Sequence, residues 1–187
     1  LSSAASDVYK RQGCTYVLNK TSGQIYEQMS QMAQLYAQEL DNRFLRISRN
    51  LFSTIMDTNE TNSTFWGNVN LMKNGDYSEY AIGKLREEYF SSAWEYGTEY
   101  RIFLYTHDTD KLYQLSLSSD GNYTMSSDVA ASIREQIDKL DEKTYAVKRK
   151  WDVLECDNEV YICKIAQKNG IALGCIVNVK SILEPFS

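Results

Sequence analysis

The first long pattern along the chain is an alternation of apolar and polar residues with a helical period. From Ser22 to Met56, apolar side chains recur in steps of three or four residues, which places them on one face of a helix. These positions are Ile25, Met29, Met32, Tyr36, Leu40, Phe44, Ile47, Leu51 and Ile55. Thr21 followed by Gln24 resembles a capping box at the helix start, and a polar run from Asp57 ends the helix. A helix of about 35 residues is roughly 50 Å long, so we expect part of it to pair with a partner or to reach toward a membrane; a core helix with a frayed end is the alternative.

The residues after this helix carry a weaker helical signal and then a strand signal. Residues 65–98 contain a Gly-Asp turn and a helical patch, marked by Tyr80, Leu85, Tyr89 and Phe90, which we expect to cover one face of a sheet. Beyond them, short runs rich in β-branched and aromatic residues are separated by turn residues, which predicts strands. The predicted strands are Tyr100–Thr106, Lys111–Leu117, Lys148–Cys156, Glu159–Gln167 and Ile171–Val179. A helix capped by Ser127 and Asp128 is predicted through Leu140, between the second and third strands.

The order of these elements, together with residues of the last third, resembles a family of sensors. The residues that carry the resemblance are Trp151 at the start of a strand, the Tyr161-Ile162 strand, Leu173-Gly174 before Ile176-Val177, and Ile182-Leu183-x-Pro185 as the exit. Over roughly residues 22–187 the chain is similar to the extracellular Cache-type sensor domain of bacterial sensor histidine kinases and chemoreceptors. The resemblance implies an α+β fold, in which a long N-terminal helix is followed by a PAS-like five-stranded antiparallel sheet with flanking helices.

The resemblance also implies a function and partners. It implies a ligand-sensing domain on the extracytoplasmic side of a bacterial plasma membrane, within a membrane-anchored receptor of a two-component system. Such a domain binds a small molecule (an amino acid, a carboxylate, an amine or a sugar), forms a homodimer through its long helix and meets the membrane through flanking segments. Residues 13–57 are then the signalling and dimerisation helix, and residues 58–187 the sensor module that ends in the start of an exit helix. A dimerisation spacer that binds no ligand is an alternative.

The first twelve residues, LSSAASDVYKRQ, show neither a helical nor a strand period. They are similar to the translated adapter sequence found at the ends of reading frames from environmental DNA. We therefore expect residues 1–12 to be a non-native leader and leave them out of the fold prediction.

Composition and residue inventory argue against two other classes of function. The net charge is −5, from 20 basic and 25 acidic residues, which gives no electrostatic support for binding nucleic acid. The single histidine, His107, lies in a turn signature, and the sequence has no Gly-rich phosphate loop and no spacing typical of metal ligands. We expect no catalytic activity, no metal and no cofactor.

One set of candidate ligand residues follows from the family resemblance. In amino-acid-binding members of the family, Tyr, Arg, Trp, Tyr and Asp converge on the carboxylate and amine of the ligand. The nearest match here is Tyr145-x3-Arg149-x-Trp151-Asp152, with the Tyr–Arg spacing one residue short and Asp152 in place of the second Tyr. Arg149 could clamp a carboxylate and an aromatic ring could cover an ammonium, whereas core packing is the alternative for Trp151.

A second set follows from strand alternation. Arg101, Phe103 and Tyr105 share one face of the first strand, so polar tips lie there on an aromatic surface, as in small-molecule sites. We expect Tyr113 of the second strand and Tyr161 of the fourth strand to join this face, under the helix and loop between the second and third strands. The alternative is that Arg101 and the tyrosine hydroxyls reach solvent at the sheet edge.

The four cysteines, Cys14, Cys156, Cys163 and Cys175, lack the spacing of a zinc site. Cys163 and Cys175 fall on adjacent predicted strands near register, which allows a cross-strand disulfide. Buried free thiols, which behave as small apolar groups, are the other interpretation.

A structural filament or adhesion subunit is the rival function, because a long N-terminal helix before an antiparallel sheet also describes pilin-like proteins. Against it, residues 22–45 are amphipathic and rich in Gln and Glu, where a pilin needs a continuous apolar stretch.

Overall fold

The computed structural model describes residues 2–57, 64–75, 77–90, 95–118, 121–140 and 150–184. The chain divides into two compact units, one ending at Leu45 and the other beginning at Arg46, and each is described by itself. No helix in the described part of the chain is both long enough and apolar enough to span a membrane.

The first unit is one continuous helix, the N-terminal part of α1 (Ser2–Met56). The prediction that this helix starts near Ser22 is wrong, and Thr21 lies inside the helix instead of capping it. Residues before Ser22 offer no proline and only one glycine, Gly13, so nothing local stops the helix from continuing toward the N-terminus. Every side chain from residue 7 to 35 is exposed, so the apolar stripe is uncovered over these residues in the single chain, whereas Tyr36, Leu40 and Phe44 are half-buried.

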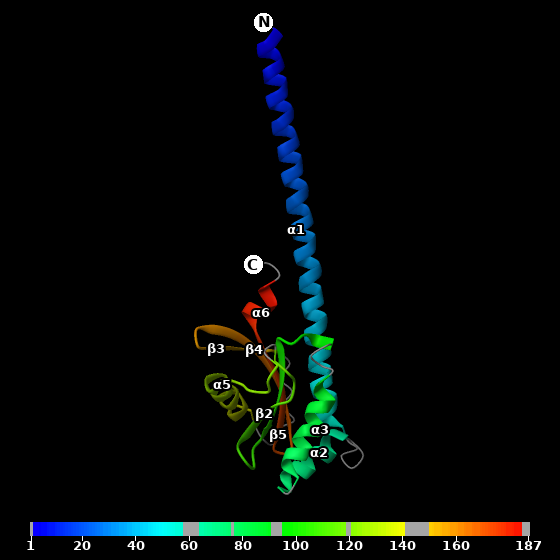
Figure 1. Ribbon diagram of the computed structural model, residues 1–187, viewed down its shortest axis with the longest axis vertical. Helices are drawn as coiled ribbons and strands as arrows, with labels where there is room; N and C mark the ends of the chain where they lie inside the picture. The colour runs from blue at the N-terminus through cyan, green and yellow to red at the C-terminus, as the bar shows by residue number, and fades with distance from the viewer. Residues whose placement is uncertain are drawn as a thin grey trace. The chain divides into compact units, whose positions relative to one another are not determined.

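The second unit has the expected α+β fold (Figure 1), and its PAS-like five-stranded antiparallel sheet is confirmed. The strands are β1 (Tyr100–Thr106), β2 (Lys111–Gln114), β3 (Asp152–Cys156), β4 (Glu159–Lys168) and β5 (Ile171–Asn178), in the spatial order β2-β1-β5-β4-β3. The last strand therefore lies in the centre, between the first and the fourth. Every neighbouring pair is antiparallel.

Two tight turns fix the register of the last three strands. Asn169 and Gly170 join β4 to β5, and Asp157 and Asn158 join β3 to β4, with positive φ at all four positions. Positive φ at both central residues is the conformation of a two-residue hairpin turn, which Asn, Asp and Gly adopt at low cost. The predicted turns at these positions are therefore confirmed.

The second strand is shorter than predicted. It ends at Gln114 because the backbone N–H groups of Leu115 and Ser116 both donate to the Ile102 carbonyl, at 2.8 and 3.4 Å, so that two residues oppose one. This bulge moves the chain off the ladder before Leu117.

Helices cover both faces of the sheet. On one face lies α5 (Ser127–Asp138), whose buried Val129, Ile133 and Ile137 pack against strand residues; its N-cap is Ser126 instead of the predicted Ser127 and Asp128. On the other face lie α2 (Thr64–Lys73) and α3 (Ser78–Phe90), seen beside the sheet in Figure 1. Within α3, Tyr80 is 58% exposed, so its prediction as an apolar marker is wrong, whereas Leu85 and Tyr89 are buried.

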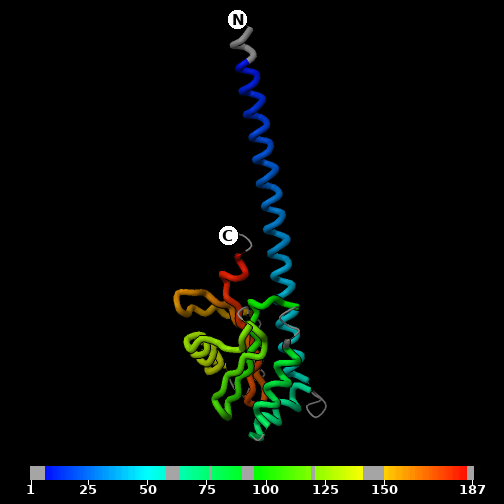
Figure 2. Tube along the Cα trace, viewed as in Figure 1, coloured from blue at the N-terminus to red at the C-terminus, as the bar shows by residue number. Residues whose placement is uncertain are grey.

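The chain leaves the sheet through a short last helix. This helix, α6 (Val179–Leu183), follows β5 without an intervening loop, as the Cα trace in Figure 2 shows. Ile182 is its buried residue.

Candidate functional site

The predicted ligand residues of the sheet do not form one group. Arg101, Tyr105 and Tyr161 share the face that α5 covers, as expected from strand alternation. Arg101 pairs with Ile176 of β5 and Tyr161 pairs with Asn178, so both lie near the end of β5 that leads into α6. Tyr105 pairs with Ala172 instead, and Ala172 lies about 20 Å along β5 from Asn178, the partner of Tyr161. A small ligand cannot contact Tyr105 and Tyr161 together.

Tyr113 lies on the wrong face for the predicted group. Its partner across the ladder is Leu104, whereas Tyr105 pairs with Leu112, so Tyr113 faces away from Arg101 and Tyr105. The prediction that Tyr113 joins their face is therefore wrong, because strand register, which the sequence does not specify, decides the face.

The second set of predicted residues lies around the start of β3. Asp152 opens the strand opposite Cys163, on the same face as Tyr161, and both Asp152 and Trp151 are half-buried. Arg149 and Tyr145 lie outside the described residues.

The middle of the face beneath α5 is filled by apolar side chains. Phe103, Ile165 and Ile176 from the sheet pack there against Val129 and Ile133 of α5. Tyr105 at the margin of this cluster donates its hydroxyl to Asp110 at 3.0 Å, and burial followed by this bond raises its pKa. The described part of this face therefore serves as core.

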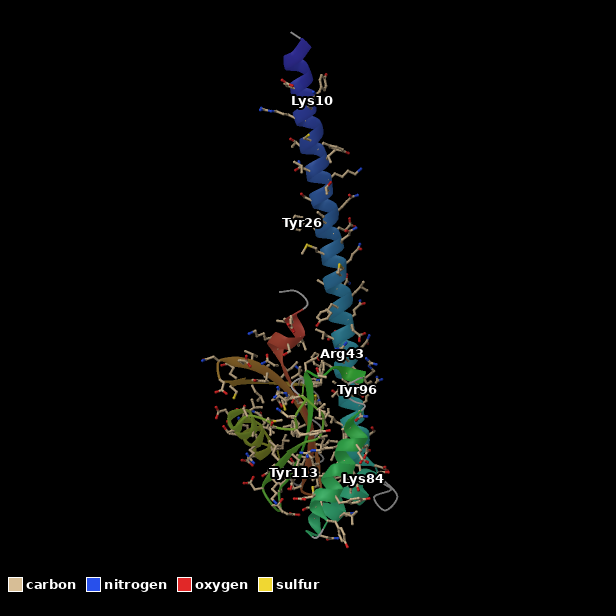
Figure 3. The ribbon with its side chains drawn as sticks, in the orientation of Figure 1. Lys10, Tyr26, Arg43, Lys84, Tyr96 and Tyr113 are labelled. Carbon is tan, nitrogen blue, oxygen red and sulfur yellow. The ribbon has the colours of Figure 1, made fainter. Side chains whose placement is uncertain are left out.

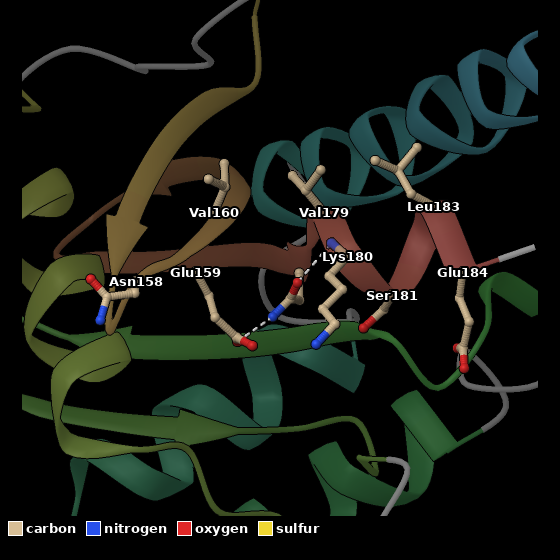
Figure 4. A pocket seen from close by; sticks show the side chains of 9 residues that line it. Asn158, Glu159, Val160, Val179, Lys180, Ser181, Leu183 and Glu184 are labelled. Carbon is tan, nitrogen blue, oxygen red and sulfur yellow. Dashed lines mark hydrogen bonds between the residues drawn. The ribbon is translucent and has the colours of Figure 1, made fainter. Parts of the chain in front are cut away.

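The candidate functional site is a surface pocket of about 650 Å³ where β5 passes into α6, called here the junction pocket (Figure 4). Its residues come from the turn between β3 and β4, from the start of β4, from the end of β5 and from α6. They are Asn158, Glu159, Val160, Asn178, Val179, Lys180, Ser181, Leu183 and Glu184.

A chain of hydrogen bonds crosses this junction pocket. The Glu159 carboxylate accepts from the Tyr161 hydroxyl at 3.0 Å and from the Asn178 side-chain amide at 2.5 Å. The other side-chain atom of Asn178, its Oδ1, accepts from the Lys180 backbone N–H at 2.8 Å and so caps α6. Asn178 thus joins the β3–β4 turn to the first turn of the exit helix.

The groups around Glu159 also interact with Arg101. Burial raises the pKa of Tyr161 most, the hydrogen bond to Glu159 raises it further, and the charge of Arg101 opposes both effects. Arg101 and Tyr161 lie on the same face of the sheet, on the two strands that flank β5. A cation therefore lies on the same side of the sheet as the hydroxyl that donates to Glu159.

The junction pocket is amphipathic. Val160 and Leu183 are 42% and 51% exposed, and in Figure 4 they point to the same side as Val179. Glu159, Lys180 and Glu184 point to the other side of the picture, so that one wall is apolar and the other charged. Such a site can hold a small molecule that carries both an apolar body and polar groups.

Sequence reasoning identified Tyr161 but missed Glu159, Asn178 and Lys180. A local signal was present, because Asn at the end of a strand directly before a helix is a preferred N-cap. No comparable signal marks Glu159, whose partners become neighbours only through strand pairing.

None of the four cysteines forms a disulfide within the described part of the chain. Cys163 pairs with Ile176, and Cys175 with Lys164, so the two thiols point to opposite faces of the sheet and the predicted possibility of a cross-strand disulfide is wrong. No group of three or more metal-ligating side chains occurs among the described residues.

No protein-family model matches this chain, and no curated protein or solved structure matches it.

Proposed function

We propose that this protein is the ligand-sensing domain of a bacterial signal-transduction receptor, most simply a sensor histidine kinase, on the extracytoplasmic side of the plasma membrane. In this proposal it binds a small molecule and transmits the binding event through its terminal helices. It has no catalytic activity of its own.

The observation that carries the proposal is the direct connection from the central strand to the exit helix. β5 is paired on both sides, and its last residue, Asn178, is also the N-cap of α6. A ligand that shifts β5 or competes for Glu159 therefore changes the position or the capping of α6 without any flexible loop between them. This mechanical continuity is what a receptor needs at its output.

The proposal includes a second copy of this chain as a partner. The first unit exposes an apolar stripe on one helix face, including Ile25, Met29 and Met32. A helix with an uncovered apolar stripe gains stability by pairing the stripe with an identical one, as in a two-fold dimer. Segments flanking residues 1–187 would make the membrane connection.

A ligand screen tests the proposal. We expect a member of one class among amino acids, carboxylates, amines and sugars to raise the melting temperature by about 5 °C at a hundredfold excess over its Kd. Arg101→Ala should abolish this shift while far-UV circular dichroism stays unchanged, because Arg101 shares the face of the sheet on which Tyr161 lies and supplies a positive charge there. Arg49→Ala, which removes a guanidinium from an exposed helical position, is the matched control and should keep the shift.

The other outcomes decide between the alternatives. A flat response across the whole screen would sink the ligand-sensing function and leave a dimerisation spacer or a module that recognises a partner protein. The reading frame beyond residue 187 is a second test, since a kinase, methyl-accepting or cyclase module there supports the receptor and a stop codon favours the filament subunit.

A further inference from the structure

A second pocket of about 690 Å³ lies at the outer edge of the sheet, away from the junction pocket. It is formed by α3, by the edge strand β2 with the turn before it, and by α5. Figure 3 labels Tyr113, which contributes to this pocket from β2. Because β2 has a neighbour on one side only, α3 and α5 reach the pocket from its two faces.

Arg86 enters this edge pocket from α3 in a fixed position. Its Nε donates to the Gln114 carbonyl at 3.2 Å, and its guanidinium carbon lies 4.4 Å from the centre of the Tyr123 ring. These contacts use Nε and one face of the guanidinium. A guanidinium carries five N–H donors, so its terminal amino groups can still bind a ligand.

Arg134 enters from α5 and forms an ion pair with Asp110, although its Nε makes no hydrogen bond within the described part of the chain. Its Nε lies 3.3 Å from Oδ1 of Asp110, and the same oxygen accepts the hydroxyl of the buried Tyr105 at 3.0 Å. The Tyr105 hydroxyl thereby restrains the exposed Asp110, whose charge attracts Arg134. Two guanidiniums therefore line one pocket from opposite sides of a strand, and that of Arg86 is the more firmly held.

The remaining lining residues favour a carbon chain with negative ends. Lys111 adds a third cation to the lining and has no ion pair within the described part of the chain. The lining carboxylates are Glu79 and Asp110, and Asp110 is paired with Arg134. Three cations against two anions leave the pocket with a net positive charge. Ile82 and Leu112 supply apolar walls.

We propose that the edge pocket binds a small dicarboxylate, with Arg86 and Arg134 each engaging one carboxylate. A planar guanidinium fork matches a carboxylate or a phosphate. Because the two guanidiniums come from separate elements, and Ile82 and Leu112 also line the pocket, a carbon chain with an anionic group at each end fits this lining better than a lone phosphate. This assignment concerns binding alone and does not rest on the proposed receptor function.

Isothermal titration calorimetry with succinate at low ionic strength tests the site. We expect saturable binding by the full chain, at least about tenfold weaker in Arg86→Gln and in Arg134→Gln, because each variant loses a charge-assisted pair. Butyrate, which has one carboxylate, should bind at least about tenfold more weakly than succinate. Lys84→Gln is the control, since Lys84 lies on the same helix as Arg86, pairs with Glu87 and does not line the pocket.

Three results would overturn the assignment: no saturable binding of succinate, inorganic phosphate bound as tightly as succinate, or an equal loss of affinity in Lys84→Gln. Arg86→Gln also removes a bond to β2, so circular dichroism must accompany it. If that variant does not fold, Arg134→Gln and the exposed Lys111→Gln decide, and unchanged affinity in both rejects the site.

Discussion

At the residue scale, the packing of the central strand β5 requires a glycine at one position. Gly174 lies in β5 between Phe103 of β1 and Ile165 of β4. The Phe103 ring occupies the space that a side chain at this position would need, and a Cβ there would lie 2.7 Å from the backbone oxygen of Lys164. The Phe103 ring can rotate, but the Lys164 carbonyl is held by the hydrogen bonds of the sheet, and moving it would cost free energy.

We therefore predict that Gly174→Ala lowers the free energy of unfolding by about 1–3 kcal/mol, as overpacking in a core does. Gly83→Ala is the matched control, because Gly83 is an exposed residue of α3 with open space around its Cα. That control should be neutral or stabilise by up to about 1 kcal/mol. Urea unfolding followed by circular dichroism measures both, and an equal response of the two variants would contradict the packing account.

Sequence reasoning succeeded only in part at this scale. Tyr161 and Arg101 were identified from strand alternation and do lie near the junction pocket, although their role in binding stays a prediction. Asn178 carried a usable capping signal. Glu159, Arg86 and Arg134 carried none, because a charged residue in a strand or an amphipathic helix is ordinary until its neighbours are known.

At the element scale, register decides which side chains meet. Cys163 and Cys175 sit on neighbouring strands but are one position out of line, so each thiol is buried on its own face. Burial is the main reason that the pKa of the Cys175 thiol is raised well above its ordinary value, and the proximity of Cys163 adds to it. Because the thiolate is the reactive form, both burial and the raised pKa suppress reaction.

Thiol labelling with an aromatic disulfide reagent at pH 8 should separate the four cysteines. We predict rapid reaction of the exposed Cys14, slower reaction of the half-buried Cys156, and reaction of Cys163 and Cys175 only after unfolding. Cys14→Ser should remove the rapid phase and nothing else. A total of two thiols instead of four in the unfolded, unreduced protein would show that a disulfide forms after all.

At the scale of the whole molecule, the first unit exposes an apolar stripe. Met29 and Met32 are 61% and 67% exposed, and Ile25 and Leu35 are also open. Several exposed apolar side chains on one face of a single helix mark an interaction site. A second copy of the chain offers an identical stripe.

We predict that the protein sediments as a dimer and that Met29→Glu with Met32→Glu shifts it to a monomer, weakening association at least about a hundredfold through burial of like charges. Gln31→Glu with Gln34→Glu adds the same charge at the same spacing on the opposite, exposed face of the helix and should leave the dimer intact. Sedimentation velocity over a range of concentrations measures both. A wild-type chain that stays monomeric at all concentrations would refute the predicted dimer.

Local patterns along the chain are enough to predict the kinds and the order of the elements. The strand at residues 100–106, the two hairpin turns and the helix beginning near residue 127 follow from periodicity and turn chemistry, which are local properties. Periodicity also predicts the long helix, except for its start, because no proline precedes Ser22 to end the helix there.

Which residues share a face or a pocket depends instead on contacts between distant parts of the chain. The bulge at Leu115 and the pairing of Tyr113 with Leu104 depend on hydrogen bonds between strands, and one position of register exchanges the two faces of a sheet. The junction pocket and the edge pocket likewise draw on segments far apart in the chain, such as α3 and α5. Contacts between distant segments are fixed by strand pairing and helix packing, and no local pattern records them.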